Sequence, residues 1–197
     1  MSITIIALLF VAYIIGSVPS AVWVGKVFYG VDVREHGSGN AGATNTFRVL
    51  GKKAGIPVLL LDITKGTIAV NLVWFQTQYG PFPAEIIPYT NLKLAFGFCG
   101  VVGHIFPVFA GFRGGKGIAT LLGLLIGLNA IAAIVAIVVF VIVFLISKYV
   151  SLGSILASLA FPFVVFVILD EKDVNASLEL FSVFVPILTL ITHQKNI

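Results

Sequence analysis

The chain has 197 residues, of which 59% are hydrophobic and only 10% charged, and its mean hydropathy is +1.11. Soluble globular domains carry about 25% charged residues, so this composition excludes that class and indicates an integral membrane protein. The single cysteine, Cys99, excludes an internal disulfide framework. The formal net charge of +4 is too small to indicate a nucleic-acid partner, and its distribution along the chain is explained by membrane topology.

Apolar stretches close to the length of about 20 residues that crosses a bilayer recur along the whole sequence. We predict an all-α integral membrane protein, one domain over residues 1–197, with seven transmembrane helices at 3–25, 55–75, 92–110, 117–128, 130–147, 152–169 and 175–193. The fourth and fifth are hard to separate, because residues 117–147 form one apolar stretch interrupted at Gly127 and Asn129. As one helix this stretch is long, and as two helices the first is short and must tilt or start deep in the bilayer.

The basic residues favour seven spans with the N-terminus outside and the C-terminus in the cytoplasm. In that topology the inner ends of the spans hold Lys26, Arg34, Arg48, Lys52, Lys53, Arg113, Lys116, Lys148 and Lys195. The outer ends hold only Lys93 and Lys172, which is the asymmetry that cytoplasmic loops show. Six spans would move Lys148 and Lys195 outside and fit the rule less well.

The first long polar loop, residues 34–53, combines flexible backbone with short polar side chains. It contributes Gly37, Gly39, Gly42, Ser38, Asn40, Thr44, Asn45 and Arg48. Glycine lets several backbone N–H groups turn toward one point, and Arg48 lies about one turn beyond Asn45 if a helix starts there. The loop therefore favours an anion site, although Ser, Asn and Gly are also common in plain turns.

The second polar loop, "GHIFPVFAGFRGGKGIAT" at 103–120, runs into an apolar helix that we expect to start near Ile118. Its Gly114, Gly115 and Gly117, together with the cations Arg113 and Lys116, have the composition of a phosphate site at a helix N-terminus. It is not a Walker A loop, because Ala110 and Gly117 stand where that motif has Gly and Ser or Thr. A membrane turn with ordinary inner-side charges is the alternative reading.

The remaining polar residues are fewer and more ambiguous. Asp62 and Lys65 lie three residues apart and share one helix face, which favours a structural ion pair over a functional one. His104 either orients the second loop or acts as a base, and His193 lies near the end of the chain. No G-x-S-x-G, His-Glu-x-x-His, His-x4-Asp or paired-cysteine pattern occurs, so we expect no metal and no enzyme-borne nucleophile.

Four segments together resemble one known family. "GSGNAGATNTFR" (37–48), "LDITKG" (61–66), "GHIFPVFAGFRGGKGIAT" (103–120) and "YVSLGS" (149–154) are similar, in order and spacing, to the bacterial acyl-phosphate:glycerol-3-phosphate acyltransferases, the PlsY family. The resemblance implies a seven-span enzyme of the bacterial inner membrane with its active site on the cytoplasmic face. It implies acyl transfer from acyl phosphate to the 1-hydroxyl of glycerol 3-phosphate, giving lysophosphatidic acid and phosphate without a cofactor.

We assign roles to the residues on this basis. Main-chain donors around Ser38–Gly42, with Thr44 and Asn45, are expected to hold the donor phosphate. The resemblance implies that Arg48 and Lys116 hold glycerol 3-phosphate, with Ser151 and Asn196 assisting. A substrate phosphate is expected to accept the proton of the attacking hydroxyl, with His104 as the alternative base.

Three further expectations complete this interpretation. The partners should be the two substrates and membrane lipid, with no nucleic acid, and the protein should be a monomer. Members of the family usually continue past the last span with a basic segment that this sequence lacks after "HQKNI", so part of the acceptor site is expected to be missing. The competing function is a transporter for a phosphorylated metabolite, which would also need basic, glycine-broken elements.

Overall fold

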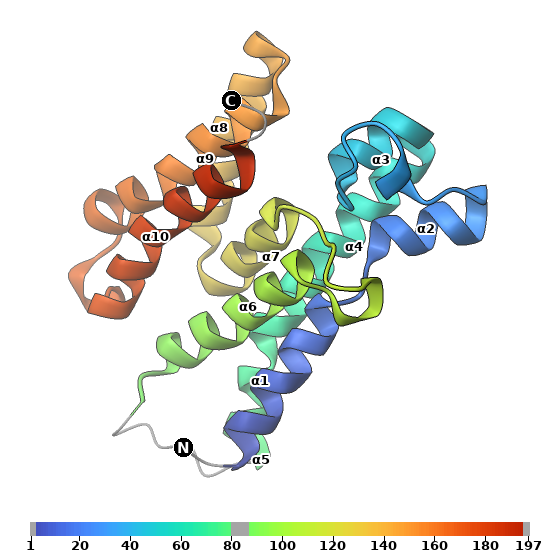
Figure 1. Cartoon of the computed structure of the whole chain (residues 1–197). Coiled ribbons are helices and arrows are strands. Elements are labelled where there is room, and N and C mark those ends of the chain that lie inside the picture. The colour runs from blue at the N-terminus through green and yellow to red at the C-terminus, as the bar shows by residue number, and fades with distance from the viewer. Residues whose placement is uncertain (1–2, 80–86, 195–197) are drawn as a thin grey trace. The chain divides into compact units, whose positions relative to one another are not determined.

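A computed structural model describes residues 3–79 and 87–194, and all regular elements in these ranges are helices (Figure 1). The chain divides into two compact units, Met1–Gly127 and Leu128–Ile197, which are described separately. The predicted all-α fold is confirmed for the described residues.

The first unit is built around three long helices, α1 (Ile3–Gly16), α4 (Lys52–Asn71) and α6 (Tyr89–Ile105), which pack side by side (Figure 1). The shorter elements of this unit are α2 (Ser20–Tyr29), η1 (Val33–Glu35), α3 (Ala43–Leu50), α5 (Val73–Tyr79), η2 (Val108–Ala110) and α7 (Ile118–Leu128). Helix α2 packs against α3 and α4, and α3 packs against α4, so the first polar loop is anchored on both sides.

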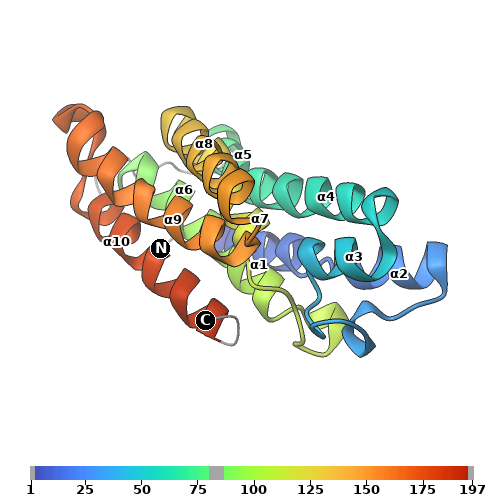
Figure 2. The same ribbon diagram turned by 90° about the horizontal axis from the view of Figure 1, so that it is seen from above.

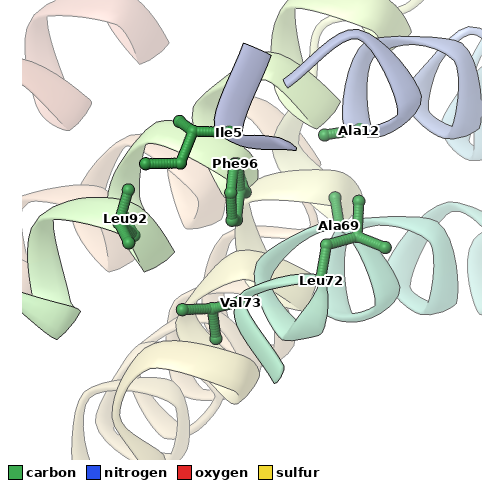
Figure 3. Packing of buried hydrophobic residues seen from close by; sticks show 7 residues of the cluster. All are labelled: Ile5, Ala12, Ala69, Leu72, Val73, Leu92 and Phe96. Carbon is green, nitrogen blue, oxygen red and sulfur yellow. The ribbon is translucent and has the colours of Figure 1, made fainter. Parts of the chain in front are cut away.

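The core of this unit is a cluster of buried apolar side chains from α1, the α4–α5 junction and α6: Ile5, Ala12, Ala69, Leu72, Val73, Leu92 and Phe96 (Figure 3). The large aromatic ring of Phe96 is fully buried. Lipid tails are as apolar as these side chains, so helix association in a membrane depends on close packing rather than on removal of apolar surface from water.

Glycines set the distance between the long helices. A Cβ at Gly16 of α1 would overlap the carbonyl of Gly100 in α6, and a Cβ at Gly66 of α4 would overlap the carbonyl of Thr120 in α7. A Cβ at Gly103 would lie 2.8 Å from the backbone nitrogen of Ser17. Backbones approach this closely only where small residues line the contact.

The first predicted span, 3–25, is not one straight helix. Helices α1 and α2 meet at an angle of 41° across a break of three residues that ends at Pro19. Proline has no N–H and its ring clashes with the preceding turn, which favours a kink or break at this point, although α4 continues through Pro57. The predicted span 3–25 is therefore represented by a bent pair of helices that together are long and apolar enough to cross a membrane.

Five helical segments of the described residues are long and apolar enough to cross a membrane: Lys52–Tyr79, Tyr89–Ala110, Ala130–Ser147, Val150–Ile168 and Ala176–His193. The bent pair α1 and α2 makes a sixth if it counts as one span. Helix α7 has only 11 residues, which rise about 16 Å and cover roughly half of the hydrocarbon core. The predicted number of seven spans and the orientation of the termini stay predictions.

The second unit contains α8 (Ala130–Ser147), α9 (Val150–Phe163), a π-helical turn η3 (Val164–Ile168), η4 (Glu171–Asp173) and α10 (Ala176–His193). Helix α9 packs against both α8 and α10 (Figure 2). The predicted break near Asn129 is confirmed, because its side-chain oxygen accepts a hydrogen bond of 2.9 Å from the Ala132 N–H and so caps α8.

The glycine contact between α1 and α6 gives a testable prediction. Replacing Gly16 with valine forces side-chain atoms against the Gly100 carbonyl, and we expect a loss of about 1–3 kcal/mol of stability. Thermal unfolding in detergent measures the loss. The control is Ala7→Val, on an exposed position of the same helix, which should unfold close to wild type. Equal shifts for both variants would contradict this packing.

Candidate functional site

The first polar loop is folded around one buried side chain, Asn45. Its Nδ2 donates to the carbonyls of Val33 (2.7 Å) and His36 (3.1 Å), and its Oδ1 accepts from the N–H of Ser38 (2.8 Å). Gly37, with φ of 62°, makes the left-handed turn that this arrangement requires. Asn45 is 1% exposed, so it holds the loop in shape, whereas Ser38 lies exposed at the surface.

The loop leads into the N-terminus of α3. Gly42 has an extended backbone and no side-chain cap, so the first N–H groups of α3 have no partner within the helix. Thr44 is exposed in the first turn, Asn40 lies half-buried just before it, and Arg48 is exposed in the last turn. The helix expected near Asn45 is therefore present as α3. Its N-terminus offers main-chain N–H donors with positive partial charge.

The second polar loop folds back onto the end of α6. The N–H of Gly114 donates to the Ile105 carbonyl and the N–H of Gly115 donates to the His104 carbonyl, each at 3.2 Å. Gly117 has φ of 84°, and α7 begins at the next residue, as predicted. Lys116 lies half-buried in this turn, and Arg113 is exposed.

The two loops meet. A Cβ at Gly42 would lie 4.0 Å from the Cα of Gly115, and a Cβ at Gly115 would lie 3.1 Å from the Ala41 carbonyl oxygen. A second link is the hydrogen bond of 2.8 Å from Arg34 Nη1 to the Ala110 carbonyl. Residues that are far apart in the sequence therefore form one cluster at one end of the first unit.

Arg34 was not among the predicted site residues. Its guanidinium is fixed by Asp32, with 2.7 Å between Arg34 Nη2 and Asp32 Oδ2, and this bond holds the pKa of Asp32 well below its usual range. Lys26 also pairs with Asp32 at 3.1 Å. The only sequence signal was the spacing of Asp32 and Arg34, two residues apart, which has no specific meaning alone.

The cations of the site lie close enough to repel each other. Burial lowers the pKa of Lys116, and the nearby charge of Arg48 lowers it further. Like charges held together at a surface with main-chain donors are typical of a site that takes an anion. A phosphate between Arg48 and Lys116 would relieve this repulsion.

The predicted ion pair between Asp62 and Lys65 is present, with 2.9 Å between Lys65 Nζ and Asp62 Oδ1. It also extends further than predicted, because His104 Nδ1 lies 3.5 Å from the same carboxylate oxygen. His104 is 5% exposed, and a Cβ at Gly115 would overlap its ring. His104 thus lies directly behind the second loop.

Two predicted site residues, Ser151 and Asn196, lie outside the first unit as the structure describes it, and their roles stay predictions. Ser151 lies half-buried in the first turn of α9, which belongs to the second unit, and Asn196 lies outside the described residues. His193 is buried near the end of α10, with its Nδ1 2.9 Å from the Thr189 carbonyl oxygen. Among residues 3–79 and 87–194, no three His, Cys, Asp or Glu side chains are grouped to hold a metal ion.

Comparison with known proteins identifies the family. The family model for glycerol-3-phosphate acyltransferase matches residues 6–197. A glycerol-3-phosphate acyltransferase of Chlorobaculum tepidum is 42% identical over 99% of this chain and 92% of its own length. One of Enterococcus faecalis is 42% identical over 98% of this chain and 87% of its own length.

Solved structures agree with these relatives. The crystal structure of PlsY, an integral membrane glycerol 3-phosphate acyltransferase, in its glycerol 3-phosphate form has a TM-score of 0.81 and 32% identity, covering 98% of this chain and 89% of that one. The lysophosphatidic acid form of PlsY gives a TM-score of 0.79 with 33% identity. The helical fold and the paired loops thus define an integral membrane acyltransferase. The chain belongs to the glycerol-3-phosphate acyltransferase family.

The role of Asn45 in shaping the first loop can be tested. Asn45→Asp keeps an acceptor for the Ser38 N–H but places a carboxylate against the carbonyls of Val33 and His36. We therefore expect the free energy of unfolding to fall by about 1–3 kcal/mol and amide exchange at residues 36–38 to become faster. Hydrogen–deuterium exchange and thermal unfolding measure the two effects. Asn71→Asp, which alters one exposed hydrogen bond to Thr67, is the control and should change little. Unaltered exchange at 36–38 in Asn45→Asp would show that the loop is held by other contacts.

Proposed function

We propose that this protein transfers a fatty acyl group from acyl phosphate to the 1-hydroxyl of sn-glycerol 3-phosphate, giving lysophosphatidic acid and inorganic phosphate. The observation that carries the proposal is the contact of the two glycine-rich loops at Gly42 and Gly115, with Arg48 and Lys116 beside it. The glycerol 3-phosphate and lysophosphatidic acid forms of PlsY support the acceptor and the product.

The reaction needs little covalent help from the protein. Acyl phosphate is a mixed anhydride, so phosphate is already a good leaving group when the acceptor oxygen attacks the acyl carbon. The C–O bond to the acceptor forms, the C–O bond to phosphate breaks, and the hydroxyl proton leaves. The protein has to hold the hydroxyl near the acyl carbon and stabilise the negative charge that develops.

The geometry favours separate places for the two phosphates. The segment Ser38–Gly42, exposed at Ser38 and Gly39, together with the side chain of Thr44 and the N-terminus of α3, suits the donor phosphate. Arg48 and Lys116, with Arg113 nearby in sequence and the turn of Gly114, Gly115 and Gly117, suit the phosphate of the acceptor.

The proton of the attacking hydroxyl is taken by a substrate phosphate in this mechanism. The carboxylate of Asp62 is buried and already pairs with Lys65, so it is not placed to touch substrate. His104 is the alternative base. We infer that the enzyme works as a monomer in the bacterial inner membrane, with this cluster on the cytoplasmic side.

The activity itself is the first test. Purified protein in detergent is given palmitoyl phosphate and radiolabelled glycerol 3-phosphate, and labelled lysophosphatidic acid is counted. Arg48→Ala and Lys116→Ala should each lower kcat/KM by about a hundredfold, because each removes a charge that the substrate phosphates contact. Lys53→Ala, on an exposed position at the start of α4, is the control and should stay near wild type.

Two outcomes would count against the proposal. Absence of labelled product from the wild-type protein would favour the transporter, because transport has no meaning in micelles. Loss of turnover in His104→Ala with unchanged substrate binding would replace substrate assistance with base catalysis by histidine.

The pKa of Lys116 predicts a pH dependence. Because this pKa is lowered, the Lys116 ammonium loses its proton at a pH below the ordinary lysine pKa of about 10.4. Its attraction for phosphate is therefore present at neutral pH and is lost as the pH rises. We expect the KM for glycerol 3-phosphate to rise in wild type between neutral and alkaline pH, and to rise less in Lys116→Arg, whose guanidinium stays charged. Initial rates across this pH range measure the effect. Lys172→Arg, an exposed replacement in the second unit, should follow wild type, and parallel curves for wild type and Lys116→Arg would refute the assignment.

A further inference from the structure

A buried polar network lies behind the second loop of the site. Asp62 and Lys65 of α4 and His104 of α6 are 1%, 6% and 5% exposed. One carboxylate oxygen, Asp62 Oδ1, lies 2.9 Å from Lys65 Nζ and 3.5 Å from His104 Nδ1. Charged groups are rare inside a membrane protein and are retained where they have a role.

One end of this network reaches the break between α1 and α2, and the other reaches the junction of the two polar loops. Lys65 Nζ donates to the carbonyl of Val18 at 2.8 Å, in the break between α1 and α2, and α2 leads to the first loop. At the other end, the His104 ring lies where a Cβ of Gly115 would be, and its own carbonyl accepts from the Gly115 N–H at 3.2 Å. The carbonyl of Ala41, from the first loop, lies at the same junction.

The geometry of the network indicates which ring nitrogen of His104 faces an acceptor. Lys65 already balances the charge of Asp62. The carboxylate lies on the Nδ1 side of the ring, at 3.5 Å and without a formed hydrogen bond, and a nearby acceptor favours the tautomer that carries its proton on that side. Nδ1 then carries the proton, and Nε2 faces Gly115 without one.

We propose that Asp62 and Lys65 are positioning residues for the acceptor phosphate, acting through His104. Asp62 fixes the tautomer and orientation of the His104 ring, and the ring supports the turn of Gly115 and Lys116 against Ala41 and Gly42. The identity of the ligand rests on the proposed function, whereas the tautomer does not. Neither residue touches the substrate, so the network sets where the binding groups lie and leaves the reacting atoms alone.

A kinetic experiment separates this role from a purely structural one. The double variant Asp62→Leu/Lys65→Met removes both buried charges together and so avoids an unpaired charge, which would prevent folding. We expect it to unfold near the wild-type temperature, to raise the KM for glycerol 3-phosphate by about tenfold, and to leave kcat close to wild type. Lys93→Met removes another intramembrane ammonium, bonded to the Gly127 carbonyl at 2.9 Å, and should leave both constants unchanged.

A spectroscopic experiment tests the network without reference to activity. Nitrogen-15 spectra of histidine-labelled protein report which ring nitrogen carries the proton, and the His104 signal is the one lost in His104→Gln. We expect Nδ1–H in wild type and a loss of that preference in the double variant.

Each result decides the matter. An Nε2–H tautomer in the wild-type protein overturns the proposal. A folded double variant overturns it too if its KM for glycerol 3-phosphate is unchanged or if only its kcat falls. If the double variant does not fold, the wild-type tautomer decides. If wild type makes no lysophosphatidic acid, the proposed function fails, and the spectra still show whether Asp62 orients His104.

Discussion

The close approach of two polypeptide backbones at Gly115 is the constraint on which the site depends. The imidazole of His104 and the carbonyl of Ala41 leave no room for a side chain at this position. Without that contact, the N-terminus of α3 and the turn before α7 would be two unrelated helix ends. With it, they form one surface that carries both main-chain donors and cations.

Hydrogen bonds inside each loop hold this surface in shape, together with the packing of α3 against α2 and α4. Asn45 supplies three of them to the first loop, and the end of α6 supplies two to the second. Preorganised donors do not have to be moved when charge develops on a substrate, which is why backbone N–H groups suit acyl transfer from an activated donor. A good leaving group then makes an enzyme-borne nucleophile unnecessary.

Features with a local cause were predictable from the sequence. The glycine-rich loops, the start of α7 and the break at Asn129 follow from residue types that act within a few positions, and Asp62 and Lys65 share a face by spacing alone. The bend near Pro19 also has a local cause, but it was not predicted because the apolar residues continue on both sides of the proline. The contacts of Asp62 with His104 and of Arg34 with Ala110 depend on how separate helices are rotated against each other, which one sequence does not reveal.

Under the proposed function, occupancy of the phosphate site at Arg48 and Lys116 would also affect the lifetime of the protein. An anion that binds there stabilises the folded state in proportion to the logarithm of its concentration over its dissociation constant. A cell rich in phosphorylated acceptor would therefore keep more of the protein folded than a starved one. Since small differences in stability alter how much protein escapes degradation, supply of the ligand would regulate abundance as well as flux.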